Sequence, residues 1–178
     1  MLLSDIPPQQ MFSIPNGASG TRATLKIMAR LARAARFESA IRGTASRLIE
    51  HCEIGGYVQQ VRECFLFVRD AIRYMNDTTG AEVVHDPVEL LASRAGDCDD
   101  KATLLAALLE SIGHPCRFVA VGYDPANGYE HVYLETRVGN DWLACETTPI
   151  NGRIQDLGFA PIPPFVPDPV ICRMVEHI

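Results

Sequence analysis

The stretch GDCDDKATLLAALL, residues 96–109, decides the fold, because it combines a turn, a cysteine and an apolar helix. Its leucines recur on one face of a helix that we predict over Cys98–Ile112. Gly113 and Pro115 end this helix, as a left-handed C-cap and a following proline do. Unpaired backbone N–H groups and the helix dipole at its start favour an anion such as a thiolate, which makes Cys98 the candidate nucleophile.

Three strands are predicted downstream of the cysteine helix. They cover Cys116–Gly122, Glu130–Val138 and Asp141–Glu146, which are mostly apolar and are bounded by turn residues. Gly139-Asn140 is typical of a tight hairpin between the second and third strands. Helices that lead into an antiparallel sheet make an α+β domain.

Upstream of residue 96, apolar residues recur at spacings of three and four, which indicates helices. One helix is predicted from Thr21 onward, a second over Glu38–Cys52 and a third from Val58 to about Tyr74. A short fourth helix begins at Asp86-Pro87 and runs through Leu91, because proline suits a first helical turn.

The chain divides into three predicted parts. Residues 1–20 hold three prolines and two glycines, which predicts an extended N-terminal arm. Residues 21–150 form a single domain, a size that one hydrophobic core supports. Residues 151–178 form a tail whose prolines are expected to exclude regular sheet and helix, so that it wraps the domain as an extended strap.

Composition places the chain among soluble globular proteins. With 178 residues, of which 47% are hydrophobic, and a mean hydropathy of +0.03, it is expected to lack a membrane helix. The formal net charge of −6 argues against a nucleic-acid partner. The first residues lack a basic n-region and a long apolar h-region, so we expect no secretory signal and a cytoplasmic protein. The basic residues between Arg22 and Arg47 are typical of the solvated face of helices, with a phosphate-binding face as the alternative.

Neither a metal nor a cofactor is predicted. None of the six cysteines, at positions 52, 64, 98, 116, 145 and 172, forms a Cys-x-x-Cys pair, and no histidine pair completes a zinc site. Asp97, Asp99 and Asp100 lack the glycine and the distal glutamate of a calcium-binding loop. Most of the thiols are therefore expected to be buried as small hydrophobic groups.

A thiol, an imidazole and a carboxylate follow in the order Cys98, His131, Glu146. In such a triad, the imidazole deprotonates the thiol and the carboxylate orients the imidazole. A two-residue hairpin loop makes His131 and Glu146 diagonal neighbours on one sheet face, roughly 7 Å apart at their α-carbons, whereas a three-residue loop would separate them. Two observations argue against a catalytic role for Cys98. A single cysteine in a helix usually just packs in the core, and the negative charges of the neighbouring aspartates disfavour a thiolate.

Four segments together resemble the transglutaminase-like superfamily. They are GDCDDKATLLAALL at 96–109, IGHPCRFV at 112–119, EHVYLE at 130–135 and WLACETT at 142–148. The resemblance covers roughly residues 57–150. With the upstream segment GTRATL, the chain looks most like small members of this superfamily from phages and prophages.

The resemblance implies a papain-like core, in which N-terminal helices precede a cysteine helix packed on a small antiparallel sheet. It also implies a catalytic triad of Cys98, His131 and Glu146. Glutamate stands at position 146 where the superfamily has aspartate, and Thr147 stands where it has proline. A glutamate can still orient an imidazole, although its extra methylene group requires a slightly different approach.

An oxyanion that forms during the reaction needs hydrogen-bond donors. The backbone N–H of Cys98 is one expected donor, and the side chain of Tyr74 is a second, with Asn76 as an alternative. Tyr74 could instead cap the core.

The implied activity is acyl transfer on a protein or peptide amide. Cys98 attacks the carbonyl group and forms a thioester, which water or another amine resolves. The chain length favours hydrolysis, as by a protease or amidase, over a crosslinking transglutaminase. The alternative is a non-enzymatic binding or structural module that reuses the fold, such as a phage assembly factor, which would be virion-associated.

Overall fold

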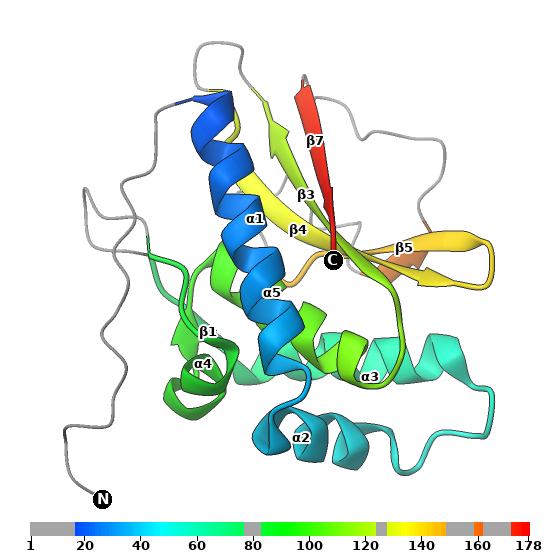
Figure 1. Ribbon diagram of the computed structural model, residues 1–178. Helices are drawn as coiled ribbons and strands as arrows, with labels where there is room; N and C mark the ends of the chain where they lie inside the picture. Colours follow the sequence, from blue (N-terminus) through cyan, green and yellow to red (C-terminus); the bar gives the residue numbers. More distant parts are fainter. Residues whose placement is uncertain (1–16, 77–82, 124–127, 149–158, 162–171) are drawn as a thin grey trace, which may run out of the picture.

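The computed structural model describes residues 17–76, 83–123, 128–148, 159–161 and 172–178 (Figure 1). Helices lie against a five-stranded antiparallel sheet, which confirms the predicted α+β fold with its cysteine helix on a small sheet. None of the helices in these residues has the length and the apolar character that a membrane span requires.

The five helices that the sequence predicts are all present. They are α1 (Ala18–Ala35), α2 (Ser39–Ile49), α3 (Tyr57–Ala71), α4 (Pro87–Ser93) and α5 (Cys98–Ser111). α1 begins inside the predicted arm 1–20, while residues 1–16 lie outside the described residues. α3 ends earlier than predicted, because Ile72 has an extended backbone and Arg73–Tyr74 form a strand.

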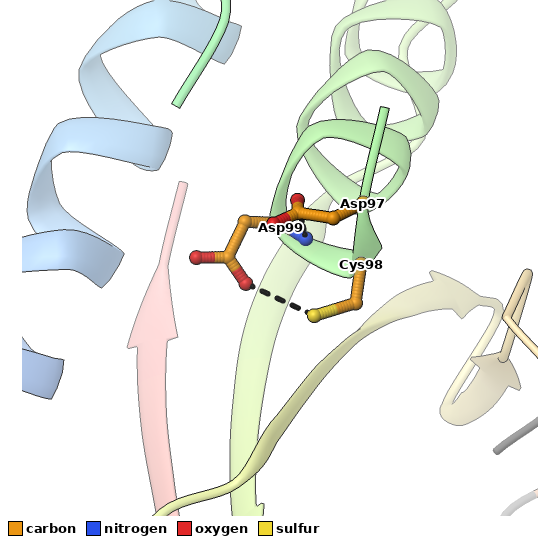
Figure 2. A group of neighbouring side chains, drawn as sticks. All are labelled: Asp97, Cys98 and Asp99. Atoms are coloured by element: carbon orange, nitrogen blue, oxygen red, sulfur yellow. Dashed lines mark hydrogen bonds between the residues drawn. The ribbon is translucent and has the colours of Figure 1, made fainter. Parts of the chain in front are cut away.

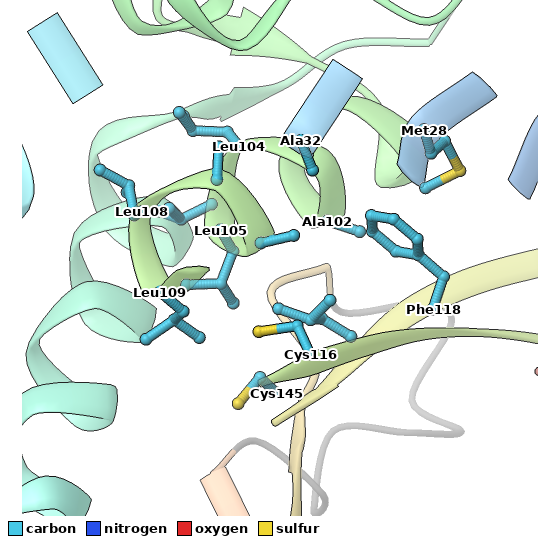
Figure 3. Close-up of a cluster of buried hydrophobic side chains, with 14 of the residues drawn as sticks. Met28, Ala32, Ala102, Leu104, Leu105, Leu108, Leu109, Cys116, Phe118 and Cys145 are labelled. Carbon is cyan, nitrogen blue, oxygen red and sulfur yellow. The ribbon is translucent and has the colours of Figure 1, made fainter. Parts of the chain in front are cut away.

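α5 lies at the centre of the hydrophobic core. Every residue from Asp99 to Leu109 is buried, although the leucine pattern predicted a single buried face. α1, α2, α3 and α4 contact α5 from several directions, and β3 and β4 of the sheet contact it as well. Figure 3 shows its leucines in the same cluster as Met28 of α1 and Phe118 of β3. A helix that is buried all round gives a rigid support for the residue at its first turn.

The main sheet has the strand order β6-β5-β4-β3-β7, and its neighbouring strands are antiparallel. The strands predicted after the cysteine helix are β3 (Cys116–Gly122), β4 (His131–Val138) and β5 (Asp141–Cys145). Val138 pairs with Asp141 across a two-residue loop, which confirms the predicted hairpin register. Gly139 in this loop has a φ of 62°, a conformation that glycine adopts without steric cost.

The expectation that residues 151–178 exclude regular sheet is wrong for two segments. β6 (Phe159–Pro161) pairs with β5, and β7 (Cys172–His177) pairs with β3, so that each forms one edge of the sheet. β7 contains no proline, and Pro161 is tolerated because an edge strand leaves one side of its backbone unpaired. The rest of the tail lies outside the described residues.

A second, smaller sheet was not predicted. β1 (Arg73–Tyr74) and β2 (Ala95–Gly96) form a parallel pair just before the cysteine helix. Two residues are too few to show an alternating pattern, so the sequence carries no signal for these strands. Their pairing fixes the end of α3 beside the turn that leads into α5.

The sheet face that points away from the helices carries a buried carboxylate. Leu134 packs in the helix-side core, so Glu135 beside it points to the opposite face. Its Oε2 accepts a hydrogen bond from Arg117 Nε (2.6 Å), and its Oε1 accepts from Arg173 (2.6 Å) and from the Tyr133 hydroxyl (3.1 Å). Because Arg117 lies in β3 and Arg173 in β7, Glu135 links three strands.

Candidate active site

Cys98 is the first residue of α5, and a capping box fixes its position. Asp97 is the N-cap, and its Oδ1 accepts hydrogen bonds from the backbone N–H groups of Asp99 (3.1 Å) and Asp100 (3.3 Å). Asp100 Oδ2 in turn accepts from the backbone N–H of Asp97 (3.3 Å). The box uses donors that have no partner within the helix, so the turn that carries Cys98 is held at both ends.

A second set of hydrogen bonds holds Asp100 from outside the helix. The backbone N–H of His85 donates to Oδ1 (2.7 Å), and His85 Nδ1 lies 2.8 Å from Oδ2. Because a carboxylate only accepts, we assign Nδ1 as the donor. Gly96 leaves room for this carboxylate, since a Cβ there would lie 2.5 Å from Asp100 Oδ2. The sequence analysis missed His85, because no motif spacing connects it to a partner fifteen residues later.

The small parallel sheet places the predicted oxyanion residue beside this turn. Tyr74 pairs with Gly96, and the backbone N–H of Met75 donates to Gly96 O (3.0 Å). The side chain of Tyr74 is 44% exposed. Its role as an oxyanion donor stays a prediction, as does that of Asn76, which is also exposed.

Lys101 of α5 is buried and anchors the end of α3. Its Nζ donates to Ile72 O (2.9 Å) and to Arg69 O (3.2 Å), where a cation is favourable beside the carbonyl groups of a helix C-terminus. Burial lowers the pKa of Lys101, while the charges of Glu146 and Asp70 act in the opposite direction. A lysine within an apolar helix was the available signal for this role, and the sequence analysis did not use it.

His131 and Glu146 meet as the hairpin register predicted. His131 Nε2 lies 2.5 Å from Glu146 Oε2, and both side chains are buried. Glu146 Oε1 accepts a further hydrogen bond from the backbone N–H of Thr148 (2.6 Å), which fixes the carboxylate. Among the residues that the structure describes, the other ring nitrogen, His131 Nδ1, is buried and has no hydrogen-bond partner. Glu146 therefore orients the imidazole through Nε2, and Nδ1 is left to accept a proton or a hydrogen bond.

The thiol of Cys98 lies at the start of the histidine strand. It accepts a hydrogen bond from the backbone of Val132, the residue that follows His131, and it donates to Asp99 Oδ1 (3.3 Å; Figure 2). Burial raises the pKa of the Cys98 thiol well above its usual range, and the charges of Asp99 and Asp97 raise it further. The hydrogen bond from Val132 lowers this pKa and offsets part of the rise. Cys98 therefore rests as a thiol, with its proton directed to Asp99.

One group of side chains in the described part of the chain could approach a metal ion. Asp97, Cys98 and Asp99 each offer a ligand atom, and these atoms lie within 4.8 Å of one another. Asp97 Oδ1 already accepts two backbone hydrogen bonds, and Asp99 Oδ1 accepts the thiol proton. Helix capping and the thiol contact explain the arrangement, and the expected absence of a metal stays a prediction.

Comparison with protein families identifies the superfamily of the chain. The profile of the transglutaminase-like superfamily matches residues 42–147, which include Cys98, His131 and Glu146. The chain belongs to the transglutaminase-like superfamily. The finer assignment to phage or prophage members stays a prediction. No curated protein matches the chain by sequence.

Solved structures support the same fold. A candidate cysteine protease from Cytophaga hutchinsonii has a TM-score of 0.52 and 17% identity, over 83% of this chain and 55% of that protein. A candidate protease from Parabacteroides distasonis has a TM-score of 0.50 and 14% identity, over 82% of this chain and 37% of that protein. The chain thus spans about half or less of the length of these two proteins, and at such identities the likeness shows the fold alone.

Proposed function

We propose that the protein is a cysteine hydrolase that cleaves an amide bond in a protein or peptide through a thioester. The observation that carries this proposal is the contact between His131 and Glu146. It leaves His131 Nδ1 buried without a hydrogen-bond partner among the described residues. The next residue in the strand, Val132, binds Cys98 through its backbone. In a cysteine nucleophile with its general base, a carboxylate holds one ring nitrogen and the other nitrogen takes the thiol proton, and we propose that role for His131 Nδ1 towards Cys98.

The reaction follows from the resting contacts. Cys98 Sγ turns from Asp99 Oδ1 to His131 Nδ1, gives up its proton there and bonds to the carbonyl carbon of the amide. Glu146 stabilises the imidazolium ion that forms, and the backbone N–H of Cys98 is the donor that we propose for the oxyanion. The imidazolium ion then protonates the departing amine as the C–N bond breaks. Water, deprotonated by His131, resolves the thioester, and the thiol leaves with a proton.

Hydrolysis and amine transfer share every step until the second nucleophile arrives. We favour hydrolysis, because the two similar structures described above are candidate proteases. A crosslinking transglutaminase would use the same chemistry and stays as an alternative. That the enzyme is encoded by a phage also stays a prediction. The raised pKa of Cys98 is the observation that favours a different class, a binding or structural module in which the thiol is inert.

Thiol reactivity tests the proposal without a known substrate. Iodoacetamide is added at neutral pH, and the labelling rate of each cysteine is measured by peptide mass spectrometry. Cys52 is the matched control, because it is half-buried like Cys98 but follows α2 and belongs to neither the cysteine helix nor the histidine strand. We expect Cys98 to react fastest of the six cysteines, and His131→Gln to remove its advantage over Cys52.

Cys98→Ala identifies the labelled peptide and should leave the fold intact, because a small residue is easily accommodated at a helix start. If Cys98 reacts no faster than Cys52, or if His131→Gln leaves its rate unchanged, the hydrolase proposal fails and the binding module takes its place.

A further inference from the structure

Asp100 is held more tightly from outside α5 than by its own capping box. The backbone nitrogen and Nδ1 of His85 lie 2.7 Å and 2.8 Å from its carboxylate oxygens, whereas the backbone nitrogen of Asp97 lies 3.3 Å away. Hydrogen bonds from N–H groups are commonly about 2.9 Å long, so the two bonds from His85 are the stronger ones. His85 therefore does most to set the position of this carboxylate.

No bulk water can replace the ring of His85 beside Asp100. The side chain of Asp100 is completely buried, while that of His85 is 38% exposed. Without the ring, Asp100 Oδ2 would keep only the long bond from the backbone of Asp97. A buried carboxylate that lacks donors is unfavourable, so we expect it to move until it finds one.

A movement of this carboxylate reaches Cys98 directly, because the oxygen lies against the turn before α5. A Cβ on Gly96 would lie 2.5 Å from Asp100 Oδ2, so there is no space between this oxygen and the backbone two residues before Cys98. On its other side, the thiol of Cys98 accepts a hydrogen bond from the backbone of Val132, the residue after His131. The position of the turn thus determines how Cys98 lies relative to the histidine strand.

We propose that His85 is a positioning residue of the active site, which acts through Asp100 to place Cys98 for proton transfer to His131. This inference rests on the proposed function and adds a residue to its machinery. The role of His85 is that of a hydrogen-bond donor, and Nδ1 carries a proton in the imidazolium ion as well as in the neutral tautomer assigned above. The role therefore requires an N–H group at the place of Nδ1 rather than an imidazole as such.

Substitutions at position 85 separate the donor from the imidazole. His85→Asn places an amide N–H as many bonds from Cβ as Nδ1, so it keeps the bond to Asp100, whereas His85→Leu has no donor. The rate at which iodoacetamide labels Cys98 at neutral pH is measured by peptide mass spectrometry. We expect His85→Leu to slow this rate about tenfold, because small misplacements of reacting groups have effects of this size or larger. His85→Asn should keep most of the wild-type rate.

A double-mutant cycle shows whether His85 acts on the reaction or only on the fold. His85→Leu is made both in the wild-type protein and in His131→Gln, which has no base for the thiol. A positioning role predicts a much smaller effect of His85→Leu in His131→Gln, because the placement of Cys98 then serves no proton transfer. A change that only loosens the fold affects the rate equally in both proteins.

His51→Leu is the matched control for the loss of a histidine that faces a carboxylate. His51 Nε2 lies 3.8 Å from Glu63 Oε2, and the pair joins the end of α2 to α3 rather than to the turn that carries Cys98. We expect this variant to label at the wild-type rate. Urea denaturation shows whether each variant keeps its fold. If His85→Leu unfolds, His85→Gln replaces it, because its amide lies one bond farther from Cβ than Nδ1 does.

The outcomes keep the two proposals apart. If His131→Gln leaves the rate of Cys98 unchanged, the hydrolase proposal fails and the positioning role fails with it. If His131→Gln slows Cys98 but His85→Leu does not, or slows it equally in both proteins, the positioning role is wrong and the hydrolase proposal stands. If His85→Asn is as slow as His85→Leu, or if His51→Leu is equally slow, the bond to Asp100 is not the cause and the positioning role is overturned.

Discussion

At the scale of single residues, Asp99 is the charged neighbour that most affects the protonation of the candidate nucleophile. Its Oδ1 accepts the thiol proton of Cys98, and its charge is the largest electrostatic cause of the raised pKa of that thiol. The contact holds the proton away from His131 Nδ1, the buried nitrogen that the mechanism needs as a base. Asp99 therefore adds to the effect of burial in keeping Cys98 protonated at neutral pH.

Asp99→Asn should make Cys98 more reactive. The amide keeps the size of the side chain and removes its charge, so the pKa of Cys98 should fall towards its usual range. The labelling rate with iodoacetamide is measured against pH, and its midpoint should move to lower pH than in the wild-type protein. Asp70→Asn is the control, because Asp70 is exposed and lies on α3. An unchanged midpoint for Asp99→Asn would show that the charge of Asp99 does not raise the pKa of Cys98.

At the scale of elements, the site depends on a close approach between the turn before α5 and α5 itself. A Cβ on Gly96 would lie 2.5 Å from Asp100 Oδ2 and 2.6 Å from Leu90 Cδ1 of α4. Neither neighbour is free to move, since Asp100 is held by three hydrogen bonds and Leu90 is part of the core. The glycine is required here by packing.

Gly96→Ala should destabilise the protein by about 1–3 kcal/mol, the usual cost of overpacking, and should slow the labelling of Cys98. Gly43→Ala is the control, because a Cβ at Gly43 in α2 would meet only a flexible arginine side chain at 3.5 Å. That change should stabilise the protein by roughly 0.5–1 kcal/mol through helix propensity. Urea denaturation measures both values, and a neutral Gly96→Ala would contradict the packing argument.

The sequence predicted those elements whose signals are local. α5, β3 and the β4–β5 hairpin have strong periodicity or a clear turn, so their ends were predicted to within a residue, and the contact between His131 and Glu146 followed from the hairpin register. β7 was missed because it forms by pairing with β3, which is distant in the chain, and prolines in the tail argued against any strand. The bond between His85 and Asp100 was missed for the same reason, since only the folded chain brings the two together.

At the scale of the whole molecule, the core contains several buried thiols. Burial raises the pKa of Cys64 to about 12, and it raises the pKa values of Cys116 and Cys145 as well. In the unfolded chain these thiols ionise near pH 8.5. Above that pH, the folded state binds more protons than the unfolded state, so stability falls as pH rises.

The free energy of unfolding should therefore decrease from about pH 8.5 upward, by as much as about 1.4 kcal/mol per pH unit for each thiol that stays protonated only in the fold. Urea denaturation under reducing conditions at neutral and alkaline pH measures this slope. Cys64→Ala should cost about 1 kcal/mol at neutral pH and make the alkaline slope shallower. A slope that is the same in Cys64→Ala and in the wild-type protein would exclude this thiol as a cause.

The pairing of β7 with β3 also sets the order in which the chain can assemble during translation. β3 lies inside the sheet, but one of its two neighbours, β7, is synthesised long after the helices and the hairpin have left the ribosome. Until Arg173 emerges, Glu135 keeps its bond to Arg117 but lacks the second guanidinium group, and the backbone of β3 is an open edge. A nascent chain that stalls before residue 172 would thus present a finished helical core with an unpaired strand, the kind of surface to which chaperones bind.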